Sequence, residues 1–217
     1  MLQLSGSEKV KKRWIAVIIL ISSAVLSAVS YYLWDIRLAY YCQGLNRTIL
    51  DIAGIITQAG DSLWYFISLI SAFILIRFVW KNEQWSAKIL YLLLCLTLSG
   101  ILNTGIKWLA GRNRPINLFE DGLFGFDFFK IAFSYESTSF PSGHAVTAFS
   151  LATAVSFLYP RWKIPAFIAA ALIALSRVVL TAHYLSDVIA GAAVGTICSL
   201  GIKYLYDRFH VELNESD

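Results

Sequence analysis

The sequence predicts an all-α membrane protein built as a bundle of six transmembrane helices. Of its 217 residues, 58% are hydrophobic and 15% are charged, whereas an ordinary soluble domain has about a quarter charged residues. The apolar residues occur in long blocks, not at the spacing of a soluble core. These blocks lack the period-2 alternation of membrane strands, which favours helices. We expect one domain over residues 1–217.

The predicted spans follow from length, because a helix needs about 20 apolar residues to cross a bilayer core. The six segments, of which the fourth is short, are residues 14–33, 63–80, 89–110, 144–159, 164–181 and 188–206. The basic residues before the first span are also typical of a signal peptide. Its full length and the aromatic residues Tyr31, Tyr32 and Trp34 at its end favour a retained helix.

Lysine and arginine predict the orientation, since they concentrate on the cytoplasmic side. With the N-terminus inside, the inner segments hold Lys9, Lys11, Lys12, Arg13, Arg77, Lys81, Lys88, Arg161, Lys163, Lys203 and Arg208. The outer segments hold Arg37, Arg47, Lys107, Arg112, Arg114, Lys130 and Arg177, three of which belong to motifs considered below. Both termini are therefore expected in the cytoplasm.

Composition also restricts the possible partners. The net charge is +4, and the basic residues sit beside apolar spans without forming a polar stripe, so nucleic acid is not an expected partner. Cys42, Cys95 and Cys198 are far apart and show neither a disulfide framework nor a zinc spacing. We expect Cys95 and Cys198, which lie in spans, to be small buried hydrophobes.

Two outer segments are long enough to carry structure of their own. Residues 45–57 could form a short interfacial helix, and residues 111–141 are rich in glycine and aromatic residues. The latter segment fits a loop anchored at the level of the lipid headgroups. It equally fits a lid or a lipid-contacting rim over a site.

The first cluster of ionisable residues lies at the end of the third span: Lys107, Arg112 and Arg114, followed by Pro115. Lys107 and Arg114 are seven residues apart, which is two helical turns, so both side chains could point the same way. Ionisable residues near membrane depth indicate function by default. Taken alone, this cluster also fits cations that snorkel from a helix end.

The second cluster, Pro141, Ser142, Gly143 and His144, opens the fourth span. Ser142 is a suitable N-cap, and Gly143 would let a ligand approach the backbone closely. The N-terminus of a helix presents free N–H groups and a positive dipole to an anion. A capped helix with an interfacial histidine explains the same residues without a ligand.

The third cluster follows the fifth span and contains Ser176, Arg177, His183 and Asp187. His183 and Asp187 are four residues apart, so on a helix they would face the same way. A carboxylate that orients one ring nitrogen leaves the other competent as a nucleophile or base. Arg177 and His183 do not share a helical face, which predicts a break in the helix near residues 181–183. A buried ion pair is the alternative.

Together the three clusters favour a phosphate site, because the predicted topology places all of them on the outer side. Arginine binds phosphate oxygens bidentately, and phosphoryl transfer mostly needs positioning and charge neutralisation. The clusters contain too few carboxylates and histidines for a metal-dependent centre. The sequence also lacks a P-loop, so nucleotide hydrolysis is not indicated.

These clusters resemble the three motifs of the type 2 phosphatidic acid phosphatase (PAP2) superfamily, K-x6-R-P, P-S-G-H and S-R-x5-H-x3-D. Every defining position is filled in order: Lys107, Arg114 and Pro115, then Pro141, Ser142, Gly143 and His144, then Ser176, Arg177, His183 and Asp187. The resemblance implies a six-helix core like that of the PAP2 phosphatases and the vanadium haloperoxidases.

The resemblance also implies a role for each residue. Lys107, Arg114 and Arg177 would hold the phosphate oxygens, together with Ser142 and Gly143. His183 would attack phosphorus to form a phosphohistidine, and Asp187 would orient it. His144 would protonate the leaving oxygen and later activate water, with no metal or other cofactor. The spacing alone leaves the roles of the two histidines exchangeable.

The expected function is hydrolysis of a lipid phosphate or diphosphate at the outer face of a bacterial plasma (inner) membrane. Candidate substrates are undecaprenyl diphosphate, phosphatidylglycerol phosphate, lipid A phosphates and phosphatidic acid. A phosphotransferase that passes phosphate to a second lipid is the alternative, and it would release little inorganic phosphate without an acceptor. A non-enzymatic membrane protein would be expected to lack a catalytic residue. The oligomeric state stays open.

Overall fold

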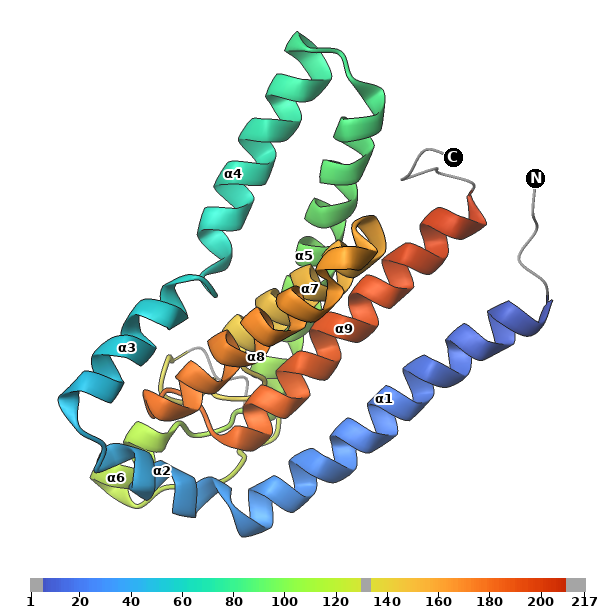
Figure 1. The fold of residues 1–217 in the computed structure, drawn as a ribbon. Coiled ribbons are helices and arrows are strands. Elements are labelled where there is room, and N and C mark those ends of the chain that lie inside the picture. Colours follow the sequence, from blue (N-terminus) through green and yellow to red (C-terminus); the bar gives the residue numbers. More distant parts are fainter. Residues whose placement is uncertain (1–5, 130–133, 210–217) are drawn as a thin grey trace.

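The computed structural model describes residues 6–129 and 134–209, and its regular elements are helical, as expected. The helices are α1 (Gly6–Leu33), α2 (Asp35–Gln43), α3 (Arg47–Gln58), α4 (Ser62–Ile74), α5 (Glu83–Ala110), α6 (Pro115–Asp121), α7 (Gly143–Leu158), α8 (Lys163–Val179) and α9 (Leu185–Arg208). Helix α7 is enclosed by α5, α8 and α9, while α1 runs along α9 at the edge of the bundle (Figure 1).

Five helical segments of the described chain are long and apolar enough to cross a membrane: Trp14–Leu33, Arg47–Val79, Glu83–Ala110, Pro160–Val179 and Leu185–Arg208. Helix α7, the expected fourth span, has 16 residues, or about 24 Å at 1.5 Å per residue. It can be short because other helices, not lipid, surround it. The predicted count of six spans is therefore approximate.

Two span boundaries differ from the prediction. The span expected at residues 63–80 leaves α-helical geometry after Ile74 and continues as a π-helical turn, Leu75–Val79. The span expected at residues 89–110 begins earlier, at Glu83, because the Asn82 side chain accepts a hydrogen bond from the Trp85 N–H (3.0 Å). Such an N-cap satisfies a backbone donor that the apolar pattern does not reveal.

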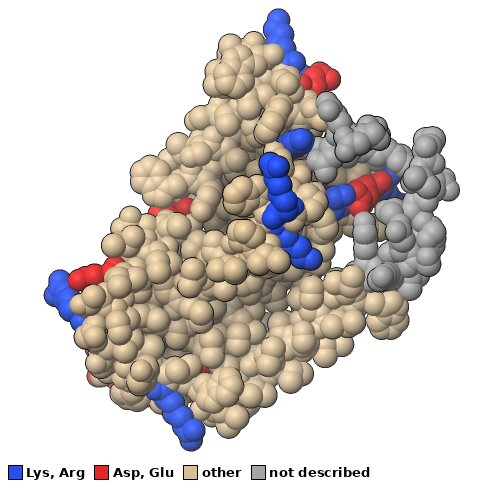
Figure 2. Space-filling model, viewed as in Figure 1, with Lys and Arg blue, Asp and Glu red and all other residues tan. Residues whose placement is uncertain are grey.

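The surface of the molecule is apolar between two charged ends. Figure 2 shows lysine, arginine, aspartate and glutamate at the ends of the bundle, with a wide uncharged belt between them. Large hydrophobic side chains in this belt are exposed, including Ile18 of α1, Ile67 of α4 and Ile168 of α8. An exposed apolar belt of this kind is the bilayer-facing surface of a multi-pass membrane protein.

Close packing between α7 and α9 forms the centre of the bundle. A Cβ atom added to Gly191 would lie 2.6 Å from the Ser142 carbonyl oxygen, and one added to Gly195 would lie 2.3 Å from that of Val146. Small residues four apart allow two membrane helices to approach closely. The Ser150 and Ser199 hydroxyls, 3.0 Å apart, form a hydrogen bond across the same contact.

The start of α7 and the start of α9 meet at one end of the bundle, which we call the site end. There the Ser142 N–H donates to the Asp187 carbonyl oxygen (3.0 Å). Helix α8 also stops here, at Val179, and the chain turns through Thr181 with a φ of 51° before α9 begins. The break expected near residues 181–183 is confirmed. The start of α1 and the end of α9 lie at the opposite end (Figure 1).

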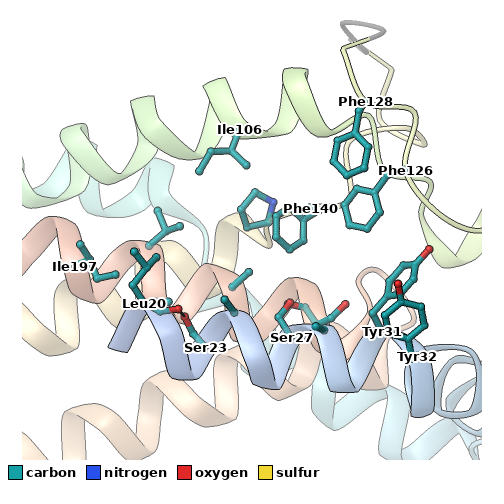
Figure 3. Close-up of a pocket in the computed structure, with 17 residues that line it drawn as sticks. Leu20, Ser23, Ser27, Tyr31, Tyr32, Ile106, Phe126, Phe128, Phe140 and Ile197 are labelled. Atoms are coloured by element: carbon teal, nitrogen blue, oxygen red, sulfur yellow. Dashed lines mark hydrogen bonds between the residues drawn. The ribbon is translucent and has the colours of Figure 1, made fainter. Parts of the chain in front are cut away.

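A groove of about 630 Å³ separates part of α1 from the bundle. In Figure 3, Leu20 and Ser23 of α1 face the groove from one side, with Ile106 of α5 and Phe140 opposite them. Near the site end, the Ser27 hydroxyl donates to the Ser186 carbonyl oxygen (3.0 Å) and joins α1 to α9. Helix α1 is thereby fixed beside the first turn of α9.

Candidate active site

Lys107 and Arg114 meet on one backbone carbonyl although they do not share a helix. Helix α5 ends at Ala110, and Gly111 adopts a left-handed conformation with a φ of 57°. The expectation that two helical turns align these residues is therefore wrong. They converge because the Lys107 Nζ (2.5 Å) and the Arg114 Nη2 (3.3 Å) both donate to the Thr138 carbonyl oxygen.

Arg114 is held from several directions and reaches the predicted nucleophile. Its Nε donates to the Tyr135 carbonyl oxygen (2.7 Å) and its Nη1 to that of Ala182 (2.8 Å). The same Nη1 lies 3.3 Å from the His183 Nε2. The Tyr135 ring stacks on the guanidinium, 3.8 Å from its central carbon. A guanidinium fixed in this way presents a rigid fork to an anion.

The N-terminus of α7 supplies donors beside these cations. Ser142 occupies the N-cap position as predicted, but its side chain makes no capping hydrogen bond. Its hydroxyl is buried and has no partner among the described residues. A buried hydroxyl without a partner is costly, so it suits a site that a ligand oxygen completes. Gly143 follows as the first helical residue, where N–H groups are free for an anion.

His183 and Asp187 lie close together, but they do not share one face of a helix as their spacing suggested. His183 precedes α9, whose N-cap is Tyr184, and Asp187 lies in the first turn. The His183 Nδ1 lies 3.6 Å from the Asp187 Oδ2. Ser139 bridges them, because its hydroxyl donates to Oδ2 (2.6 Å) and lies 3.4 Å from Nδ1. The Nδ1 therefore faces the carboxylate, and the Nε2 faces Arg114.

Arg177 and His144 approach the site from the side of α3 and α4. The Arg177 Nη1 donates to the Thr57 hydroxyl of α3 (2.8 Å), while its carbonyl oxygen accepts from the His183 N–H (3.2 Å). His144 packs against Gly60 in the turn between α3 and α4, where an added Cβ would lie 2.7 Å from the imidazole. All eight predicted site residues thus lie at the site end.

Burial and like charges control the electrostatics of the site. Burial lowers the pKa of His183 to about 3, and the charges of Arg114 and Lys107 add to this effect against the opposing hydrogen bond to Asp187. The imidazole is therefore neutral near pH 7, as a nucleophile must be. Burial also lowers the pKa of Arg114, and the charge of Arg177 lowers it further. The positive charges of these side chains repel one another, and a bound anion would offset this repulsion.

Sequence reasoning missed Ser139 and the role of Arg112. Ser139 is fully buried between His183 and Asp187, yet a single serine two residues before a motif gives no signal of its own. Arg112 lies in the first cluster but fills no motif position, so the sequence predicted no particular role for it. It is fully buried and pairs with Asp187 and with Asp35, the first residue of α2. An acidic residue directly after an apolar span was the available signal for Asp35.

The aromatic loop divides between the interior and the surface. Phe124 and Phe126 pack near Tyr31 of α1 (ring centroids 4.9 and 5.6 Å), whereas Phe128 and Phe129 are exposed. Lys130 and Phe133 lie outside the described residues. Residues 47–58 form a helix close to that expected at 45–57. The cysteines are free thiols and buried, as predicted for Cys95 and Cys198.

Comparisons with known proteins agree with this fold. The model of the PAP2 superfamily matches residues 88–210. A lipid A 1-phosphatase of Rhizobium etli is 33% identical over 90% of this chain and 86% of its own. Two solved structures share the fold. A transmembrane PAP2-type phosphatidylglycerolphosphate phosphatase from Bacillus subtilis has a TM-score of 0.66 at 21% identity, covering 92% of this chain and 98% of its own. Aquifex aeolicus LpxE has a TM-score of 0.61 at 24% identity, covering 81% of this chain and 98% of its own.

The fold, the site and these relatives define an integral membrane phosphatase. The chain belongs to the PAP2 superfamily, as its three motifs predicted. The expected class of enzyme, a lipid phosphatase, is confirmed at this level by the relatives that are 33% identical.

Proposed function

We propose that this protein removes a phosphate from lipid A at the outer face of the plasma membrane through a phosphohistidine on His183. The observation that carries the proposal is the position of Arg114, which lies 3.3 Å from the His183 Nε2 and shares the Thr138 carbonyl oxygen with Lys107. The buried Ser142 hydroxyl, which has no partner among the described residues, lies at the N-terminus of α7 at the same end of the bundle. A phosphate group would complete these donors and offset the cations. The relative of known name acts on the 1-phosphate of lipid A, which suggests the same substrate here.

In the first step, the His183 Nε2 forms a bond to phosphorus while the bond from phosphorus to the lipid oxygen breaks. Its Nδ1–H faces Asp187 and the Ser139 hydroxyl, which stabilise the positive charge that develops on the ring. His144 donates a proton to the leaving lipid oxygen. Lys107, Arg114 and Arg177 hold the three equatorial oxygens, with the N–H groups at the start of α7.

In the second step, water attacks the phosphohistidine and the N–P bond breaks. His144, now neutral, takes a proton from the water, and inorganic phosphate leaves. The chain's own cations neutralise the phosphate charge in both steps, so the proposal includes no metal ion.

The position of the site supports a lipid substrate. Lys107, Ser142 and Arg177 lie at the ends of apolar helices, at the depth where the headgroup of a bilayer lipid would sit. Described cations at the opposite end include Arg77, Lys81 and Lys203. By the bias of cations to the cytoplasmic side, we place both termini in the cytoplasm of a bacterial cell and the site on the periplasmic or exterior face.

The test is release of inorganic phosphate by the purified protein in detergent, with EDTA present, from lipid A, phosphatidylglycerol phosphate, undecaprenyl diphosphate and phosphatidic acid. We expect fastest release from lipid A by the wild type and none by His183→Ala. Faster release from another lipid would reassign the substrate. Release that requires a second lipid as acceptor would support the phosphotransferase instead. Full activity of folded His183→Ala would refute the mechanism.

A further inference from the structure

A buried charge network lies on the carboxylate oxygen of Asp187 that does not face His183. Arg112 donates to this oxygen, Oδ1, through a short hydrogen bond from its Nη1. The same Nη1 donates to the Ser186 hydroxyl (2.6 Å), and Nη2 donates to the Asp35 Oδ2 (2.7 Å). The side chains of Asp35, Arg112 and Asp187 are completely buried. The network therefore contains two carboxylates and one guanidinium, shielded from water.

Asp35 is fixed as firmly as the catalytic carboxylate. Its Oδ1 accepts hydrogen bonds from the Ser30 hydroxyl (2.8 Å) and the Ser186 N–H (3.1 Å). Its Oδ2 accepts from Arg112 and from the Ser186 hydroxyl. Ser30 and Ser186 join the end of α1 and the first turn of α9 to Asp35, while Arg112 reaches it from the segment between α5 and α6. Asp35 is thus an acceptor in every hydrogen bond described for it.

Four aromatic rings enclose the Arg112 guanidinium. Its central carbon lies 4.6 Å from the ring centroid of Tyr184 and 4.8 Å from that of Phe126. The ring centroids of Tyr31 and Phe124 lie 5.1 and 5.8 Å from the same carbon. These rings exclude water and attract the cation. The low local dielectric makes each charge in the network act strongly on its neighbours.

Stability alone does not account for such a network, because burying an ion triad is often no better than burying apolar residues of the same size. Its effect on charge is specific. One guanidinium between two carboxylates leaves a net negative charge, which Asp187 presents to His183. With Arg112 and Asp187 alone, the pair would be neutral, and Asp187 would stabilise an imidazolium less.

We propose that Asp35 and Arg112 are positioning residues for the reaction. Arg112 fixes the orientation of Asp187, and Asp35 offsets the charge of Arg112 so that Asp187 keeps its negative charge for His183. This inference rests on the proposed phosphohistidine mechanism. It assigns a function to the junction of α1 and α2, which lies outside residues 88–210, where the family model matches.

The test compares Asp35→Asn with the wild type in phosphate release from lipid A in detergent. We expect a kcat lowered by about tenfold to hundredfold, the range for loss of a buried charge-assisted interaction, with KM changed by less than about twofold. The matched control is Asp51→Asn, because Asp51 forms an exposed ion pair with Arg47 on α3. We expect this control to keep wild-type kcat.

A pH profile separates positioning from a structural defect. The charged groups that face His183 are Lys107, Arg114 and Asp187, with Arg112 and Asp35 behind Asp187. Removing the charge of Asp35 leaves the imidazolium less stabilised, so the acid limb of kcat/KM should move to lower pH in Asp35→Asn. A variant that is merely misfolded in part would lose amplitude with no shift of this limb.

The double variant Asp35→Asn/Arg112→Gln provides the decisive comparison. Arg112→Gln alone leaves two buried carboxylates unpaired, and removing the charge of Asp35 relieves their repulsion. We therefore expect the double variant to be more active than Arg112→Gln by about tenfold, a coupling typical of residues in one network. Losses that simply multiply, or an Asp35→Asn enzyme with wild-type kcat and pH profile, would overturn the proposal. Failure of the proposed function itself would instead appear in the wild type or in His183→Ala.

Discussion

Gly191→Ala should show how far the site depends on the close approach of α7 and α9. The added Cβ would lie 2.6 Å from the Ser142 carbonyl oxygen and 3.0 Å from the Ala145 Cβ. The first distance is about 0.8 Å shorter than an ordinary contact of 3.4 Å, so the first turn of α7 must move away. That shift loosens the hydrogen bond from the Ser142 N–H to Asp187 and displaces the phosphate donors from His183.

The expected cost follows from this displacement. A misplacement of about 1 Å in a catalytic site can lower the rate by about a hundredfold, so we expect kcat to fall by about 10- to 100-fold. Overpacking should also lower the free energy of unfolding by about 1–3 kcal/mol. Steady-state phosphate release and thermal unfolding in detergent measure the two effects.

The matched control is Gly201→Ala, the same substitution on the same helix. Apart from its chain neighbours and its own helix backbone, no atom of the described residues lies within 4 Å of an added Cβ at Gly201. Alanine is also the better helix former by about 0.5–1 kcal/mol. We expect this variant to keep wild-type kcat and to unfold at an equal or higher temperature. If Gly191→Ala behaves like Gly201→Ala in both assays, the helix contact does not position the site and the reasoning is refuted.

Three further predictions concern the site. Ser142→Ala removes a buried hydroxyl without a described partner, so kcat/KM should fall about tenfold while the free energy of unfolding stays unchanged. The control Ser150→Ala breaks the hydrogen bond to the Ser199 hydroxyl, so it should lose about 1 kcal/mol of stability and keep its activity. Arg114→Lys cannot reproduce the three bonds to backbone oxygens, so kcat/KM should fall at least about tenfold, and an equal rate would argue against a phosphate fork. Burial lowers the pKa of His183 from 6.5 to about 3. Between these pH values His183 binds a proton in the unfolded state but not in the folded state, so the free energy of unfolding decreases as the pH falls below 6.5. The decrease reaches about 2 kcal/mol at pH 5. His183→Gln should therefore lose less thermal stability than the wild type between pH 7 and pH 5, and an equal loss would contradict the shift.

The sequence predicted the fold well where apolar length decides the outcome. The first, fifth and sixth spans were expected at residues 14–33, 164–181 and 188–206, and the apolar spans of the structure, Trp14–Leu33, Pro160–Val179 and Leu185–Arg208, cover nearly the same residues. The prediction was weaker where side-chain caps and local turns decide. The cap at Asn82 extends α5, and the π-helical turn after Ile74 interrupts α4. Hydropathy carries no information on either feature.

For the site, the sequence predicted the residues better than the way they meet. The spacing of Lys107 and Arg114 suggested a shared helix, but the left-handed Gly111 ends the helix between them. They are brought together by the Thr138 carbonyl oxygen, in a loop 24 residues beyond Arg114. A backbone acceptor in an irregular loop has no residue signature, so only the folded chain reveals this contact.

Asp35 and the role of Arg112 could not be predicted from the sequence for the same reason. Each is a single charge beside an apolar span, and the two residues lie 77 positions apart in the chain. Spacing arguments reach only one or two helical turns, whereas this network joins the start of α2 to the first turn of α9. The motif residues supply the groups that would touch phosphate, while the network sets the charge that they experience. A reaction that develops positive charge on a buried imidazole depends on the phosphate-binding groups and on the network. In a low dielectric, a misplaced carboxylate near the imidazole changes the activation barrier as much as a misplaced hydrogen-bond donor to the phosphate.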